Sequence, residues 1–192
     1  MEWLLLTYNL PSEPSRNRVS VWRQLRRTGA VNFQQSLWVL PDQEQARAYF
    51  GDLAREIETL GGQATMLRVS SLTERDEANI RRAFTDARDN EYREIIDKCQ
   101  DFFAEIDKET RVENFTFAEV EENEEELAKL RAWFDKVCRR DFTGSALRQE
   151  VSQLLNRCEG VLSEFCDRAH KEESSPRKVT VARGDGGGMT AP

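Results

Sequence analysis

Two stretches near the start of the chain are apolar on both faces of an extended backbone. Within residues 31–41, the run Leu37–Pro41 is apolar at every position, and residues 3–10 have nearly the same character. Strands that alternate apolar and polar side chains have one wet face, whereas a continuous apolar run is typical of a strand covered on both sides. We therefore expect a sheet built on these two strands.

Helix signals separate these strands and follow them. Ser15 is placed as the N-cap of a helix that ends at Gly29, and Asp42 as the cap of a second helix that ends at the glycine pair 61–62. A last strand is expected at residues 64–69. The order βαββαβ predicts a ferredoxin-like domain.

We assign this domain to residues 1–72. After it, every pattern is helical. Apolar side chains recur at spacings of three and four from Ile80 to Ala169, in one long helix or two joined near residues 89–90, and then in two further helices. We predict an antiparallel helical bundle over residues 73–172 and a disordered tail over 173–192. The fold class is α+β.

Composition narrows the class of protein. Of 192 residues, 28 are Lys or Arg and 35 are Asp or Glu, which gives a net charge of −7. The chain has no apolar run of the roughly 20 residues that a membrane helix needs, and its four cysteines have no CxxC spacing. We expect a cytoplasmic protein without a signal peptide, a membrane anchor or a cofactor.

The charge is unevenly distributed. Residues 11–40 carry five arginines and one glutamate, for a local charge of +4. On a helical wheel the apolar side chains Val19, Trp22 and Leu25 are expected to face the core. The opposite side carries Arg16, Arg23 and Arg27, within about 40° and over about 16 Å.

The arginines of this helix are Arg16, Arg18, Arg23, Arg26 and Arg27. A guanidinium group can bind two phosphate oxygens at once, so the predicted function of these residues is contact with the DNA backbone. The alternative is an ordinary solvated helix face. Neither RNA-binding aromatic motifs nor a helix-turn-helix pattern accompanies the arginines.

Several separated motifs resemble the N-terminal region of the chromate-resistance regulator ChrB. They are YNLPSEPSR at 8–16, VWR at 21–23, GAV at 29–31, QSLWVLP at 35–41, RDNEY at 88–92, NFTFAE at 114–119 and DF at 141–142. The likeness covers about residues 2–170. It implies a transcriptional regulator of chromate efflux that binds DNA, and it implies that the second, C-terminal domain of such regulators is absent here.

The βαββαβ part is also similar to the central domain of the repressor PaaX and to the small CRISPR adaptation protein. PaaX-type repressors carry a winged helix in front of this unit, and we expect none here. In the CRISPR relatives an aspartate at the end of strand one binds a metal ion, and that position is Asn9 here. An amide is a poor ligand for Mg²⁺, so we expect no nuclease activity and no enzyme.

Two further candidates have ordinary explanations. Cys166 and His170 are four residues apart, which can place them on one helix face, but two ligands are too few for structural zinc. The acidic runs at 105–109 and 121–126 are expected to be solvated faces. A scaffold that pairs with a protein partner is the alternative to DNA binding. We also expect a homodimer, because Trp3 and Trp38 would be costly to leave in water.

Overall fold

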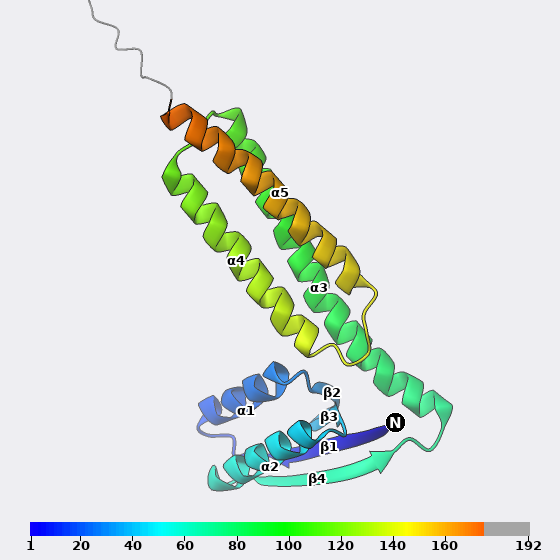
Figure 1. The fold of residues 1–192 in the computed structure, drawn as a ribbon. Helices are drawn as coiled ribbons and strands as arrows, with labels where there is room; N and C mark the ends of the chain where they lie inside the picture. The colour runs from blue at the N-terminus through cyan, green and yellow to red at the C-terminus, as the bar shows by residue number, and fades with distance from the viewer. Residues whose placement is uncertain (175–192) are drawn as a thin grey trace, which may run out of the picture.

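A computed structural model describes residues 1–174 of the chain, and its elements follow the predicted order (Figure 1). The sheet domain contains β1 (Glu2–Asn9), α1 (Ser15–Arg27), β2 (Val31–Gln34), β3 (Leu37–Pro41), α2 (Glu44–Thr59) and β4 (Gln63–Ser70). The bundle contains α3 (Glu74–Arg111), α4 (Phe117–Arg139) and α5 (Leu147–Glu173). The predicted α+β class is confirmed. The predicted tail lies almost wholly outside the described residues.

The four strands form one antiparallel sheet in the order β2-β3-β1-β4. β1 is central, and its Leu5 stands opposite Val39 on one side and Leu67 on the other. This strand order, together with the βαββαβ sequence order, is the ferredoxin-like arrangement.

Helices pack on both faces of the sheet, as the apolar runs predict, and the second face is covered in part. One face carries α1 and α2, and its core is formed by Leu4, Leu6, Val21, Leu25, Trp38, Leu40, Phe50, Leu53 and Ile57. The first turns of α3 pack on the other face, where Trp3 and Val39 meet Phe84. The Trp3 and Phe84 rings stack with centroids 5.4 Å apart.

The premise of the predicted homodimer is wrong. Trp3 is 1% exposed and Trp38 is 4% exposed, so the chain itself already covers both. Trp3 also donates its indole N–H to Glu77 on α3, at 2.8 Å. Neither tryptophan therefore offers apolar surface to a second copy.

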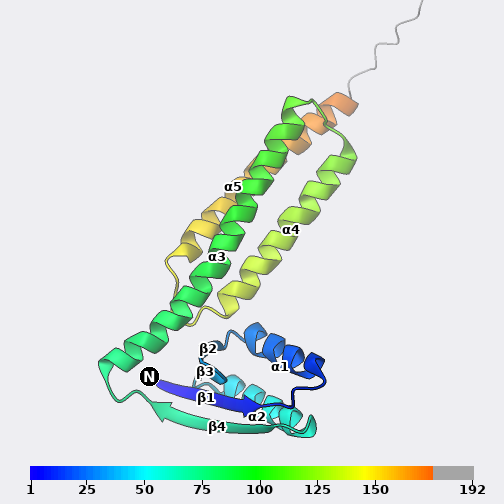
Figure 2. The same cartoon turned by 180° about the vertical axis from the view of Figure 1, so that it is seen from behind.

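The bundle stands on one end of the sheet domain (Figure 2). α3 is one unbroken helix of 38 residues, which settles the choice between one helix and two. Arg88 and Tyr92 are both buried, so the buried side of α3 continues past residues 89–90. α3 thus contributes to the sheet core and to the bundle core, which consists of Tyr92, Ile95, Cys99, Phe102, Ile106, Leu127, Leu130, Val137, Val151, Leu155, Cys158, Leu162 and Phe165.

Some predicted helix caps are displaced. α1 begins at Ser15 itself, after Pro14, and α2 is preceded by Gln43. Asp42 instead binds two cations, with its carboxylate 2.5 Å from Arg47 and 3.1 Å from Arg68. α4 does have a side-chain cap, since the hydroxyl of Thr116 accepts a hydrogen bond from the backbone N–H of Glu119 at 3.4 Å.

The two cores meet closely at Gly29. Its φ is +83°, and a Cβ placed there would lie 2.8 Å from the Cβ of Arg140 and 3.2 Å from the Phe142 ring. Gly144 also has a positive φ, of +74°, but nothing lies within 4 Å of the corresponding Cβ position. A substitution at Gly144 would cause backbone strain alone, whereas one at Gly29 would cause strain together with crowding between the domains.

We expect Gly29→Ala to lower the free energy of unfolding by more than Gly144→Ala does. Both changes place an alanine in the left-handed region, at a cost of about 1–2 kcal/mol. Only Gly29→Ala also pushes the α4–α5 loop away from the sheet domain. Urea unfolding of both variants measures the difference, and equal losses would show that the contact at Gly29 is unimportant.

Candidate nucleic-acid interface

α1 buries a narrow arc of its surface. Val21 and Leu25 are fully buried, whereas Val19 and Trp22 are each 44% exposed. The predicted inward side of Val19, Trp22 and Leu25 is therefore wrong for two of its three members. α1 packs on the sheet along Val21 and Leu25 and on α2 along Gln24, which donates to Glu56 at 2.8 Å, so Trp22 is turned outward.

All five predicted arginines of α1 are exposed. Within residues 1–174, none of them forms an ion pair or a side-chain hydrogen bond with another residue. Arg16, Arg23 and Arg27 lie opposite Val21 and Leu25 on the wheel, so the predicted outer stripe is confirmed as an exposed surface. Its binding to DNA is untested by the structure.

The other two arginines lie nearer the flank that carries Trp22. The guanidinium of Arg26 lies over the Trp22 ring, 5.1 Å from its centroid. Stacking of this kind stabilises a cation by about 0.5–1 kcal/mol at an exposed site. Arg18, one turn before Trp22, lines a hollow beside α1. The arginines are thus divided between an outer stripe and an aromatic flank.

That hollow has a volume of about 440 Å³ and lies between α1, the end of β1 and the β2–β3 hairpin. Its lining residues are Tyr8, Asn9, Leu10, Arg18, Trp22, Asn32, Gln35, Ser36 and Trp38. Burial raises the pKa of the Tyr8 hydroxyl, and a hydrogen bond with Trp38 opposes that rise. Sequence reasoning missed this hollow, because its walls come from three separate segments.

A second group of charges lies where the bundle meets the sheet domain. Arg88 of α3 is 3% exposed, and one oxygen of Glu91 lies 3.2 Å from Arg88 Nη1 and 3.1 Å from Arg140 Nη2. Burial lowers the pKa of Arg88. Arg140 donates a hydrogen bond to this oxygen, whereas Nε and Nη1 of Arg88 lack a partner in hydrogen-bonding geometry within the described residues, so Glu91 balances Arg88 by proximity alone.

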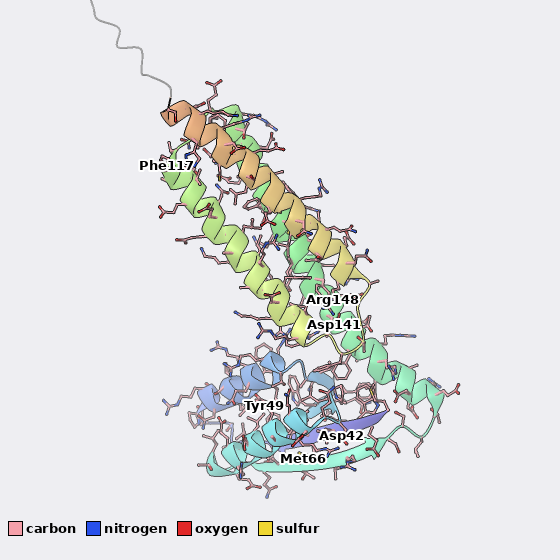
Figure 3. The ribbon with its side chains drawn as sticks, viewed as in Figure 1. Asp42, Tyr49, Met66, Phe117, Asp141 and Arg148 are labelled. Atoms are coloured by element: carbon pink, nitrogen blue, oxygen red, sulfur yellow. The ribbon has the colours of Figure 1, made fainter. Side chains whose placement is uncertain are left out.

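The loop between α4 and α5 completes this junction. Asp141 accepts hydrogen bonds from the backbone N–H groups of Gly144 and Ser145, and the Tyr92 hydroxyl donates to it at 3.3 Å. Figure 3 labels Asp141 at the end of the bundle beside the sheet domain, with Phe117 at the opposite end. Polar contacts therefore join α3 to the loop between α4 and α5 at this junction.

The remaining predicted sites are placed as structural features. The Asn9 side-chain oxygen accepts from the backbone N–H of Gln63 at 3.0 Å, which joins β1 to β4. His170 meets the edge of the Phe117 ring, and Cys166 packs against the bundle core. In the part of the chain that is described, no three His, Cys, Asp or Glu side chains are gathered as metal ligands.

The acidic runs are not wholly solvated. Glu109 is 5% exposed and is held by Lys108 at 2.9 Å and by the Asn114 amide at 2.5 Å, which together lower its pKa. Its neighbours Glu105 and Asp107 are exposed, as predicted. No helix within residues 1–174 is both long enough and apolar enough to cross a membrane.

Comparison with known proteins places the chain in a family. The family described as "Protein ChrB, N-terminal" matches residues 18–176, which is most of the chain. The chain belongs to this family. Its ChrB-type region includes α1 from Arg18 onward, the whole hairpin and the bundle.

A curated relative agrees with this assignment. Protein ChrB of Cupriavidus metallidurans is 33% identical over 92 residues, which cover 48% of this chain. The same alignment covers 28% of the relative. Of the motifs that carried the resemblance in the sequence, those at 8–16, 21–23 and 35–41 each contribute residues to the hollow beside α1, and those at 88–92 and 141–142 meet at the junction.

We expect Trp22→Ala to change the free energy of unfolding by less than about 1 kcal/mol, because the indole is half in water. Leu25→Ala, one turn later and fully buried, should cost about 2–5 kcal/mol. Thermal or urea unfolding of the two variants distinguishes the outward from the inward side of α1. A loss at Trp22 as large as that at Leu25 would contradict the observed orientation.

Proposed function

We propose that the protein is a DNA-binding regulator of chromate efflux, and that α1 is its contact with the phosphate backbone. The supporting observation is that its five exposed arginines have no anionic partner within residues 1–174. DNA supplies a row of anions at a regular spacing, which such a surface can neutralise.

Other exposed arginines provide the contrast. Arg55, Arg93 and Arg111 are at least half exposed, and each is paired with an aspartate on its own helix. No acidic residue lies between Arg16 and Thr28. α1 therefore keeps a concentrated positive charge without local compensation, whereas these three arginines are compensated on their own helices.

The negative net charge of the whole protein favours one orientation on DNA. With a net charge of −7, most of the protein is repelled by DNA, whereas α1 is attracted. Such a molecule binds DNA through one face and has little affinity through the others. This suits a regulator better than a protein that coats nucleic acid without selectivity.

The family supports the chromate-related part of the proposal, and the site supports a regulator in preference to an enzyme. The resemblance to the CRISPR adaptation protein implies a carboxylate at the position of Asn9, whereas the amide oxygen present here accepts a hydrogen bond from the backbone N–H of Gln63. The proposal includes a cytoplasmic location, since its ligand is DNA. A scaffold that pairs with a protein partner through α1 is the alternative, and exposed Val19 and Trp22 favour it.

Replacing Arg16, Arg23 and Arg27 together by alanine should weaken binding to every duplex sequence alike. Each lost phosphate contact should lower the slope of log K against log salt by about 0.9. The matched control replaces Arg55, Arg93 and Arg111, which changes the net charge by the same amount at paired sites. Titrations at several salt concentrations measure both variants, and equal behaviour would favour the scaffold.

We also propose a homodimer, through a surface other than the two tryptophans. Leu67 on the edge strand β4 is 50% exposed, beside half-buried Leu5 and on the face that α3 covers only in part. We expect Leu67→Glu to dissociate the dimer, because a buried carboxylate without a partner is costly. Leu72→Glu is the control, since Leu72 is 96% exposed but lies after the strand. Sedimentation of the wild type as a single 22.2 kDa species at high concentration would exclude the dimer.

A further inference from the structure

The hollow beside α1 has the chemistry of a site for one unpaired nucleotide. Its lining combines an aromatic ring, a cation and several amide and hydroxyl groups, and none of the residues that line it is acidic. An aromatic ring stacks on any base, a guanidinium binds phosphate, and amides read the edge of a base. An acidic side chain, which would repel phosphate, is missing from these walls.

Trp22 supplies the stacking surface. It is 44% exposed, although a tryptophan that only stabilised the fold would be expected to lie inside. Arg26 lies over its ring, and Trp22 also lines the hollow together with Arg18. A base that enters the hollow can therefore extend this stack by one further member.

Within residues 1–174, two of the amides that line the hollow keep hydrogen-bonding atoms free. Asn9 uses its oxygen to accept from Gln63, which leaves its NH₂ group to donate. Asn32 uses its NH₂ group to donate to the backbone oxygen of Gln35 at 2.5 Å, which leaves its oxygen to accept. One fixed donor and one fixed acceptor on the same rim match the edge of a nucleobase.

Arg18 supplies the phosphate contact. It is exposed and makes no ion pair within the described residues, and it is one turn from Trp22 on the same helix. On the wheel Arg18 lies about 160° from the centre of the outer stripe, and Arg26 lies between them beside Trp22. A DNA strand that leaves the stripe and passes Arg26 can thus place one nucleotide at the hollow.

We propose that the hollow between α1, the end of β1 and the β2–β3 hairpin captures one unpaired base of a DNA strand, stacked on Trp22, with its phosphate on Arg18. This inference rests on the proposed DNA binding and adds a specificity to it. It makes a distorted or locally opened duplex the preferred ligand over a perfect one.

The test compares three labelled duplexes by fluorescence anisotropy: a perfect duplex, the same duplex with one extra unpaired base, and the same bulge with an abasic site. The wild type should bind the duplex with the extra base about tenfold or more tighter than the other two, which is the usual size of one base–aromatic contact. The abasic bulge keeps the phosphate and the bend, so it isolates the contribution of the base.

Five variants assign the preference to the hollow. Trp22→Ala should abolish the preference for the extra base, Trp22→Phe should keep part of it, and Val19→Ala should keep it in full, since Val19 is equally exposed but lies outside the hollow. Arg18→Ala should reduce the preference for the bulge, whereas Arg23→Ala should weaken all three duplexes alike. The unfolding free energy of each variant confirms that it is folded.

The outcomes separate this inference from the proposed function. If duplexes bind through Arg16, Arg23 and Arg27 without any preference for the extra base, the inference is overturned and DNA binding stands. If Trp22→Ala retains the preference, the hollow is not the site. If no duplex binds, both proposals fall. A deoxynucleoside monophosphate that occupies the hollow while the preference for the bulge is absent would assign the hollow to a free nucleotide instead.

Discussion

The whole arrangement depends on the packing of α3 against the second face of the sheet. A four-stranded ferredoxin-like sheet with two helices has one face bare, and its apolar side chains must be covered by something else. Phe84 meets that need by stacking on Trp3, and Glu77 binds the indole N–H of the same tryptophan. Because α3 continues without a break into the bundle, this contact also fixes where the bundle stands.

The junction between the two cores restricts the orientation of the bundle on the sheet domain. Arg88 and Arg140 share the carboxylate of Glu91 in a nearly dry environment, and Gly29 lets the loop after α4 come close. A buried charge cluster of this kind contributes little net stability, since desolvation opposes the attraction. Its effect is on geometry, because a displaced helix would leave a buried guanidinium without any carboxylate.

Much of the fold could be predicted from the sequence because its signals are local. The two apolar runs identified strands covered on both sides, and the three-and-four spacing identified the bundle helices. The orientation of α1 was predicted incorrectly. The prediction followed the large apolar side chain of Trp22, whereas the residues that α1 buries are Val21 and Leu25. The outer arginines were still placed on the exposed surface, since their stripe lies about 160° from the side that is buried and about 120° from the side that was predicted.

The candidate site was less predictable for a different reason. Its arginines belong to one helix and could be found from composition alone, but the hollow depends on which segments the sheet brings together. Asn9 and Asn32 are far apart in sequence. They line the same hollow because β3 pairs with both β1 and β2. The apolar stripe of α3 did contain a visible signal for the junction, since Arg88 interrupts it between Phe84 and Tyr92.

The unbroken course of α3 has a mechanical consequence. At 38 residues it is a rod about 57 Å long, with one end in the sheet core and the rest in the bundle. Because the helix has no break, a tilt of its far end moves its near end, where Phe84 packs on Trp3 of the sheet. Such a tilt would also change the close approach of Arg140 to Gly29, so a movement at the far end of the bundle would reach the segment that directly follows α1.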